Sequence, residues 1–389
     1  MPSTRRSFLL TAATSSLASP ADPLPVALIG AGGRGRYLMK VFRQDPDVRI
    51  AGVCDVYEPN LEAGLSESGG ARAYRNYKAV LDSKDIQAVI IATPEHWHHR
   101  MLLDALAAGK DVYVEKPLCQ TPQQGVELVD AARRSKSIIQ VGMQRRSYDL
   151  FLKGREIVAS GQLGRVRMIR SWWLNNNLAA SASRLQGPLD WEQWQGPAPR
   201  RPLHPDRFFH WRSFADYSGG IMADQGAHVF DGIHMLMGAG YPLAVNASAG
   251  QVLKAGFDTA ERVVVTAEYP EDFVAIFTIN YAAMRYKLAN DQLNSLDGDR
   301  ARLDIGRERL ALYLQGSDDQ PSSTFASRGF SYAAEAHVRN FLDCVRTRQT
   351  PTATVEAGFQ AVLVTQMANL SLREQRRVRW NAALRKVEL

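Results

Sequence analysis

The chain has 389 residues, of which 45% are hydrophobic and 22% charged, enough for two domains of ordinary globular composition. Its formal charge of +7 comes from scattered basic residues, not from a basic stripe interleaved with aromatic residues, so nucleic-acid binding is not indicated. No apolar run reaches membrane-spanning length, and the three cysteines have neither metal-ligand nor disulfide-framework spacing.

The amino terminus carries a pair of arginines, Arg5-Arg6, followed by small and apolar residues up to Ala18. This arrangement is similar to a twin-arginine signal, which directs the export of folded proteins. We therefore expect residues 1–21 to be a signal peptide and the protein to be periplasmic or otherwise exported. An unstructured basic tail is the alternative interpretation.

A glycine-rich turn follows the first apolar strand and precedes a helix. Gly30 would permit the tight turn, Gly32 would let the backbone approach a pyrophosphate, and Gly35 would let the helix pack closely on the strand. The next strand ends at Asp55, 25 residues after Gly30, where a carboxylate accepts hydrogen bonds from ribose hydroxyls and repels a 2′-phosphate. The pattern predicts a dinucleotide site and favours NAD over NADP. The residues of the turn are Gly30, Ala31, Gly32, Gly33, Arg34 and Gly35.

Strand and helix patterns alternate over residues 24–144, which is the rhythm of a parallel sheet with helices on both faces. Over residues 145–389 the rhythm changes to a long strand, a polar and aromatic stretch at 175–218, a helix at Gly220–Gly238, and then alternating strands closed by two helices. We expect an α/β fold: a Rossmann dinucleotide-binding domain, then an α+β domain with an open-faced, mostly antiparallel mixed sheet. The expected strands are Val26–Ile29, Arg49–Cys54, Ala71–Tyr74, Ala88–Ala92, Asp111–Glu115, Ile138–Gly142, Arg165–Leu174, Ala244–Gln251, Arg262–Glu268, Phe273–Tyr281, Ala301–Ile305 and Arg309–Gln315, and the closing helices are Tyr332–Thr347 and Val355–Leu372.

Three histidines lie within the stretch Thr93–His99, at the carboxyl end of an apolar strand, where nucleotide-binding folds place their ligands. No carboxylate or cysteine at a standard spacing completes a metal-ligand set, and His98 and His99 point in different directions on a helix. We therefore expect a role in the cofactor loop and the helix start, and no metal.

Lys116 follows the next strand in the tripeptide Glu115-Lys116-Pro117. At that strand end its ammonium group can reach the crevice and stabilise a substrate hydroxyl that becomes an alkoxide. By itself the tripeptide is common, and a surface lysine is the alternative.

A second group of ionisable residues lies on the expected helix after residue 219. Asp224 and His228 are four residues apart and Asp231 follows three further on, so one imidazole would have a carboxylate on each side. Such carboxylates would hold the ring and favour its protonated form, which suits a general base that takes a proton from a carbinol. A structural Asp–His pair is the alternative.

Taken in order, these motifs resemble those of the Gfo/Idh/MocA family of oxidoreductases. The order is a glycine turn, an acid after the second strand, Thr-Pro-x-x-x-His, Glu-Lys-Pro and Gly-Gly-x-x-x-Asp-x-Gly-x-His. The resemblance implies a tightly held, non-dissociable NAD or NADP, a sugar, sugar-derivative or cyclitol substrate, and a homodimer or homotetramer formed through the second sheet. It assigns the catalytic roles to Lys116, Asp224 and His228. For the cofactor site it implies Gly30, Gly32, Gly33, Arg34, Gly35, Asp55, Thr93, Pro94, His98, Glu115, Lys116 and Gln144.

The stretch over residues 175–218 is too long to be a simple connection and is interpreted as a lid or sugar platform. Its tryptophans could stack on sugar faces, and its basic residues could bind hydroxyls or a carboxylate. A packed structural excursion is an equally good interpretation. The candidate substrate residues are Arg145, Trp173, Arg207, His210, Trp211 and Arg212.

These features predict an NAD(P)-dependent oxidoreductase that acts on a secondary alcohol of a sugar or cyclitol. One alternative is a redox-neutral glycosidase that uses bound NAD for transient oxidation at C3 and elimination. Another is a non-catalytic sugar-binding protein. The intact Lys116 and His228 favour the oxidoreductase.

Overall fold

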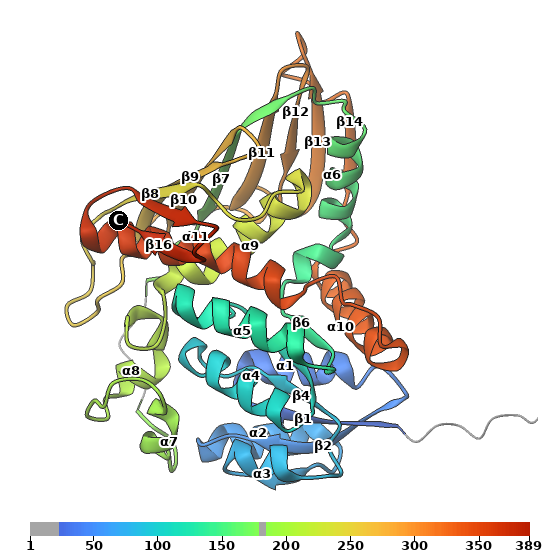
Figure 1. The fold of residues 1–389 in the computed structure, drawn as a ribbon, viewed down its shortest axis with the longest axis vertical. Coiled ribbons are helices and arrows are strands. Elements are labelled where there is room, and N and C mark those ends of the chain that lie inside the picture. Colours follow the sequence, from blue (N-terminus) through green and yellow to red (C-terminus); the bar gives the residue numbers. More distant parts are fainter. Residues whose placement is uncertain (1–22, 179–183) are drawn as a thin grey trace, which may run out of the picture.

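The computed structural model describes residues 23–178 and 184–389, which form two sheets connected by helices (Figure 1). The expected signal peptide, residues 1–21, lies outside the described residues. Within the described part of the chain, no helix is both long and apolar enough to cross a membrane.

The first sheet is the predicted parallel sheet, with strand order β3-β2-β1-β4-β5-β6. The chain leaves β1 toward β2 on one side and later returns to β4 on the other, so the order reverses at β1. Ligands of such sheets bind at the carboxyl ends of the strands at this switch point. The strands are β1 Leu24–Ile29, β2 Val48–Cys54, β3 Arg72–Tyr74, β4 Ala88–Ile91, β5 Asp111–Val114 and β6 Ile139–Val141, and the helices are α1 Gly33–Phe42, α2 Glu58–Ser68, α3 Tyr77–Asp82, α4 His98–Ala107 and α5 Pro122–Arg134.

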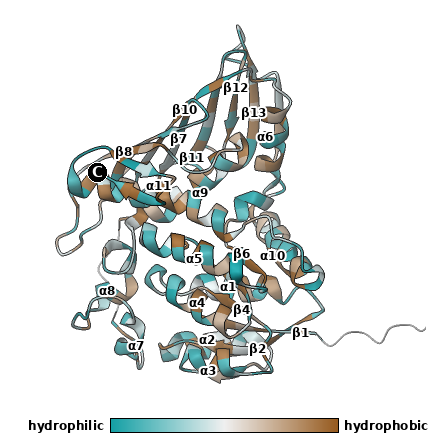
Figure 2. Cartoon of the chain, viewed as in Figure 1, coloured by the Kyte–Doolittle hydropathy of each residue, from teal (hydrophilic) through white to brown (hydrophobic). Residues whose placement is uncertain are grey.

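Helices cover both faces of this sheet, because its central strands are apolar on both sides; β4 is buried along its whole length. Figure 2 shows apolar and polar residues mixed around α4, α5 and α10 (Phe330–Thr347), the pattern of helices that cover a sheet. Helix α10 packs on the first sheet although it follows the second in sequence: Phe341 contacts the rings of Phe42 and Tyr113, each at 5.9 Å between centroids.

The second sheet has ten strands in the order β14-β13-β12-β11-β7-β10-β9-β8-β15-β16. Only the central pair, β7 and β10, is parallel, so the predicted mostly antiparallel mixed sheet is confirmed. The polar strand β11 is absent from the sequence-based prediction, as are the short strands β14, β15 and β16. The strands are β7 Val166–Leu174, β8 Ala244–Ala249, β9 Arg262–Tyr269, β10 Phe273–Asn280, β11 Gln292–Gly298, β12 Ala301–Ile305, β13 Arg309–Leu314, β14 Ser323–Ala326, β15 Val378–Asn381 and β16 Lys386–Glu388.

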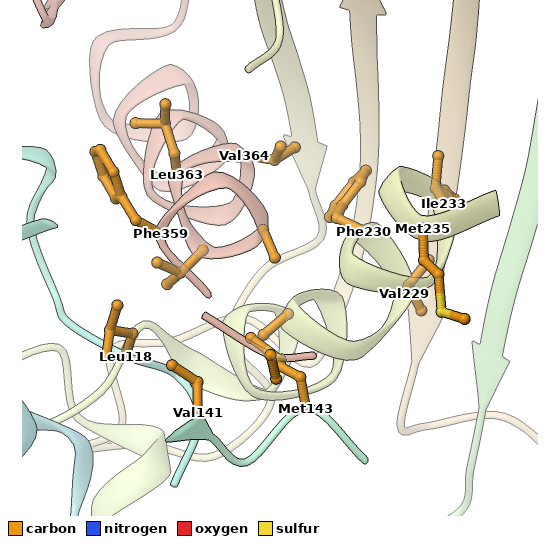
Figure 3. Close-up of a cluster of buried hydrophobic side chains, with 14 of the residues drawn as sticks. Leu118, Val141, Met143, Val229, Phe230, Ile233, Met235, Phe359, Leu363 and Val364 are labelled. Atoms are coloured by element: carbon orange, nitrogen blue, oxygen red, sulfur yellow. The ribbon is translucent and has the colours of Figure 1, made fainter. Parts of the chain in front are cut away.

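One face of the second sheet is buried under α6 (Asp149–Ala159), α9 (Gly220–Met237) and α11 (Val355–Glu374). Every second residue of β9 and β10 points into this layer and is buried, while the residues between them are more exposed. Figure 3 shows side chains of α9 and α11, among them Phe230 and Phe359, meeting others from the end of the first sheet. The apolar core is therefore continuous between the two sheets and fixes α9 above the first sheet.

The polar and aromatic stretch after β7 reaches back to the first sheet instead of staying with the second. It contains α7 (Trp191–Gln195) and α8 (Pro205–Phe209), which lie beside the first sheet in Figure 1. The backbone carbonyl of Trp194 accepts a hydrogen bond from Trp97 Nε1 at 2.8 Å, and the Glu58 amide donates to the Pro188 carbonyl at 3.0 Å. This segment therefore covers the region where β2 and β4 end.

Candidate active site

A large cavity, of about 1020 Å³, lies at the carboxyl edge of the first sheet. Residues from the ends of β1, β2, β4 and β5 line one side, and residues of β7, α9 and the stretch after β7 line the other. This is the switch point of the first sheet, where such folds bind their ligands. The cavity brings together most of the site residues that the sequence predicts.

The glycine-rich turn is shaped for a close ligand. Gly30 has a φ of +92°, and a Cβ there would lie 2.8 Å from the Ala92 carbonyl group. A Cβ at Gly35 would lie 1.9 Å from the Gly30 oxygen, so only glycine lets α1 approach β1 this closely. Gly32 and Gly33 line the cavity, and a Cβ there would meet little or nothing within 4 Å. Their backbone and the start of α1 therefore form an open cradle that fits a pyrophosphate.

Asp55 lies beside this cradle with its carboxylate fixed by backbone groups. Its Oδ2 accepts from the Ala31 amide at 2.7 Å and its Oδ1 from the Tyr57 amide at 2.9 Å. Burial raises the pKa of Asp55, against the lowering effect of these hydrogen bonds. A carboxylate held in this way can accept hydrogen bonds from the ribose hydroxyls of a dinucleotide.

Lys116 and Asp224 meet across the two halves of the molecule. Lys116 Nζ donates to Asp224 Oδ1 at 2.6 Å and to the Asp224 carbonyl at 3.0 Å. Arg212 Nε lies 3.4 Å from the same Oδ1. Burial by itself would raise the pKa of Asp224, but the charges of Lys116 and Arg212 outweigh it and the pKa is lowered. Asp224 is therefore an anion that fixes the ammonium group of Lys116 at the cavity wall.

His228 lines the cavity one helical turn from Asp224, with its ring stacked near Trp173 at 6.4 Å between centroids. It is 7% exposed, and its Nδ1 has no hydrogen-bond partner among the described residues. Burial, followed by the charges of Lys116 and Arg145, lowers the pKa of His228 well below its usual value. The imidazole is therefore neutral near pH 7 and can accept a proton.

The expectation that a carboxylate on each side holds the His228 ring is wrong. Asp224 binds Lys116, and Asp231 Oδ1 accepts from Arg146 Nε at 2.6 Å. The helical spacing places the three side chains near one another, but cations from other elements are stronger partners for these carboxylates than a neutral ring. His228 is positioned by packing instead.

Among the remaining predicted cofactor residues, Arg34, Thr93, Pro94, Glu115 and Gln144 line the cavity. Arg34 Nε donates to Glu115 Oε1 at 2.8 Å, which ties the glycine turn to the end of β5. The Oε1 atom of Gln144 is buried without a partner among the described residues. These groups fit a dinucleotide that extends from the glycine turn toward β6.

His98 does not line the cavity, contrary to the prediction. Its ring lies behind the wall, with Nδ1 at 2.7 Å from the Pro117 carbonyl and Nε2 at 2.9 Å from the Thr93 carbonyl. Burial lowers the pKa of His98, so the ring is neutral and donates one hydrogen bond. It braces the loops that follow β4 and β5.

The candidate substrate residues divide into two groups. Arg145, Trp173, Trp211 and Arg212 line the cavity. Arg207 and His210 do not: Arg207 donates to Asp216 Oδ2 at 3.0 Å and covers the Phe214 ring, and His210 packs near Phe257. For those two residues the packed excursion is the better interpretation.

Glu95 is a buried residue that the sequence places only within the cofactor loop. Its carboxylate accepts from Ser218 Oγ at 2.8 Å and from the Gly219 amide at 3.1 Å, immediately before α9. Burial, with a contribution from the Asp224 charge, raises the pKa of Glu95 to about 7. It ties the loop after β4 to the helix that carries Asp224 and His228.

Two further cavity residues are Gln292, on β11, and Arg307, in the turn between β12 and β13. No motif surrounds either residue. Only the pairing of β11 with β7 brings Gln292 to the cavity, and sequence reasoning had no signal for it.

Comparison with known proteins agrees with this geometry. Residues 24–143 match the model of an oxidoreductase family with an NAD-binding Rossmann fold, and residues 155–379 match the model of that family's C-terminal alpha/beta domain. The chain is similar to an uncharacterized oxidoreductase of Synechocystis, at 25% identity over 63% of this chain and 62% of the relative. It is also similar to inositol 2-dehydrogenase 2 of Saccharopolyspora erythraea, at 29% identity over 38% of this chain and 44% of the relative.

Those two curated relatives are therefore matched over less than two thirds of their own length. The solved structure of a levoglucosan dehydrogenase with NADH and levoglucosan has the same fold, with a TM-score of 0.74, 19% identity, and coverage of 92% of this chain and 99% of that one. The two matched models together span most of the sequence. The chain belongs to the Gfo/Idh/MocA family of oxidoreductases and contains its NAD-binding Rossmann domain.

Proposed function

We propose that this protein oxidises a secondary alcohol of a sugar, sugar derivative or cyclitol with a nicotinamide cofactor. The observation that carries this proposal is the meeting of a fixed ammonium group, Lys116, and a neutral buried imidazole, His228, in the cavity that also contains the glycine cradle. The similarity to an inositol dehydrogenase and to a levoglucosan dehydrogenase supports the substrate class.

Each polar group has one task in this reaction. His228 takes the hydroxyl proton, and the ammonium of Lys116 stabilises the oxygen as it gains negative charge. Asp224 holds Lys116 in place. A nicotinamide cofactor held by the glycine turn and Asp55 would accept the hydride from the carbinol carbon, which would make the product a ketone. The reverse reaction uses the same groups, with His228 as the acid.

We propose NAD as the cofactor, and tight binding of it. Asp55 supports NAD because its fixed carboxylate would lie against a 2′-phosphate. The segment after β7 supports tight binding: Gln193, Trp194 and Phe208 line the same cavity as Asp55 and cover its nucleotide end. Mass and absorbance spectra of the cofactor in the purified protein test both statements.

Turnover is tested by adding a panel of sugars and cyclitols to the NAD-loaded protein and following absorbance at the wavelength of NADH. Reduction of the cofactor by wild-type protein and its loss in His228→Asn support the proposal. Glycoside cleavage without net reduction would instead support the redox-neutral alternative. Ligand binding that never changes the nicotinamide spectrum would support the non-catalytic one.

We also propose that a second copy of the chain covers the open face of the second sheet. Met168 and Val264 are 41% and 42% exposed on that face. Size-exclusion chromatography with light scattering, comparing wild type with Val264→Lys, tests this proposal.

Export by the twin-arginine route remains a proposal that rests on Arg5-Arg6. Cell fractionation of wild type and an Arg5→Lys/Arg6→Lys variant tests it.

A further inference from the structure

Arg145 is a buried cation that forms no ion pair with any carboxylate of residues 23–178 and 184–389. Its side chain lies at the catalytic end of the cavity and the residue is only 7% exposed. One guanidinium nitrogen donates to the neutral side chain of Gln292, and the other terminal nitrogen, Nη1, has neither accessible surface nor a partner among the described residues. Burying a charged donor in this state is costly unless a ligand pairs with it.

The carboxylates near Arg145 are already bound by other arginines. Asp231 and Asp291 are the acidic groups whose charges act on Arg145. Asp231 pairs with Arg146 at 2.6 Å, and Asp291 pairs with Arg307 at 2.6 Å. Burial and the nearby charge of Arg307 lower the pKa of Arg145 to about 10, so it remains a cation at neutral pH.

Basic side chains outnumber acidic ones among the residues that line the catalytic end, where the carboxylate of Glu115 pairs with Arg34. Four cations line this end, and two carboxylates bind three of them: Asp224 contacts Lys116 and Arg212, and Asp291 contacts Arg307. The four cations are Lys116, Arg145, Arg212 and Arg307.

The cofactor does not supply the missing anion. Its negative groups are the pyrophosphate oxygens, which belong at the glycine turn after β1. Arg145 follows β6, three strands from β1 in the sheet order β1-β4-β5-β6, which corresponds to about 14 Å at the usual strand spacing. An oxidised nicotinamide is itself cationic and adds to the positive charge.

Arg145 is close enough to the reacting groups to bind part of the substrate. Its guanidinium carbon lies 5.3 Å from the centre of the Trp173 ring, and that ring stacks near His228. The Arg145 guanidinium has only the neutral Gln292 as a hydrogen-bond partner in the described part of the chain and lies next to apolar ring faces, so it suits one carboxylate better than a phosphate dianion, which requires several donors.

We propose that the substrate is a sugar acid, or another polyol that carries a carboxylate, and that Arg145 binds this carboxylate while His228 acts on a hydroxyl group of the same molecule. This inference rests on the function proposed above and adds a charge requirement to it.

The test compares matched pairs of substrates with the NAD-loaded full-length protein: D-glucuronate and D-gluconate against D-glucose, and D-galacturonate against D-galactose, with D-glucose 6-phosphate as the phosphate probe. We expect at least one acid to exceed its neutral counterpart in kcat/KM by tenfold or more. In Arg145→Met the ratio of acid to neutral kcat/KM should fall roughly 10- to 100-fold, the effect of losing one charged hydrogen bond. Arg145→Lys should keep part of the ratio, and the exposed Arg155→Met on α6 should not change it.

A binding measurement separates this inference from the proposed function. The preferred acid should raise the midpoint of thermal unfolding of wild type and not of Arg145→Met. Acids that bind through Arg145 without reducing the cofactor would contradict the proposed oxidation and support the carboxylate subsite. Neutral sugars or the phosphate ester acting better than every acid, an unchanged ratio in Arg145→Met, or no acid binding at all would overturn the subsite.

Discussion

The two ends of the cavity are constructed in different ways. At the nucleotide end, backbone groups and glycines make the surface, and Asp55 is fixed by the amides of Ala31 and Tyr57. At the catalytic end, charged side chains make the surface, and the central contact joins Lys116 and Asp224, which are 108 residues apart in the sequence. The comparison teaches that cofactor binding depends on local chain geometry, whereas the chemistry depends on how the two halves of the molecule are assembled.

The largest effect is expected when the imidazole at the catalytic end is removed, which tests whether the two ends of the cavity act independently. His228→Asn should lower kcat by about 10²- to 10⁴-fold, because the proposed general base is lost, while the protein keeps its cofactor. Steady-state kinetics and the cofactor content of the purified variant measure the two effects. His234→Gln on the same helix is the control, since His234 bonds to Tyr269 away from the cavity. Loss of cofactor from His228→Asn would show that the two ends are not independent.

The next effect is expected at Lys116. Lys116→Met should lower kcat by roughly 10²- to 10³-fold, because the developing oxyanion loses its cation. Lys110→Met is a matched control at the opposite end of β5, where Lys110 donates to backbone carbonyls. Normal turnover in Lys116→Met would exclude the lysine from the chemistry, and partial recovery in Lys116→Arg would support its electrostatic role.

The nucleotide end is tested with Asp55→Asn. We expect the affinity for NAD to fall about 10- to 100-fold through the loss of charged hydrogen bonds, while kcat at saturating NAD changes little. Dissociation constants for NAD and NADP, measured on cofactor-depleted protein, give the result and the change in preference. The exposed Asp47→Asn is the control. A fall in kcat as large as the fall in affinity would show that turnover also depends on the nucleotide end of the cavity.

The smallest expected effect is in the pH profile. His228 acts as a base only when neutral, and burial, Lys116 and Arg145 lower its pKa, so the neutral form persists below the ordinary histidine pKa of about 6.5. At pH values near 6.5, kcat/KM for oxidation should therefore fall by less than the twofold expected of an unperturbed histidine. The acidic limb should move upward in Arg145→Met, because one cation is removed. A wild-type limb centred at or above the ordinary value would contradict the lowered pKa.

Sequence reasoning brought the residues of the nucleotide end to one cavity because the determinants of the turn are local. A strand, three glycines and an acid after the next strand fix the turn, and Gly30 and Gly35 have backbone environments that exclude a Cβ. The first sheet was predictable for the same reason, since β1 and β4 are apolar runs between helical patterns.

The catalytic end was predicted only in part. The residue types of Lys116 and His228 indicate the chemistry that we propose for them, but they did not indicate that Asp224 would bind the lysine instead of the imidazole. Strand β11 was missed because it is polar. Its Asn294 is buried and accepts a hydrogen bond from Ser171 on β7. That hydrogen bond offsets the cost of burying the amide only when the two strands are paired. The prediction for His98 was wrong because the sequence pattern is the same whether the histidine ring lies between two backbone carbonyls or faces a ligand.

Helix α10 gives the first sheet a dependence on the far end of the chain. Phe341 and Leu342 complete the apolar layer over Phe42 and Tyr113, yet they are synthesised more than two hundred residues later than either partner. When only the first sheet and the second sheet have emerged from the ribosome, the apolar face of the first sheet that α10 covers is still exposed. Translation must run nearly to completion before that layer is covered, and until then its apolar surface is available for non-native contacts.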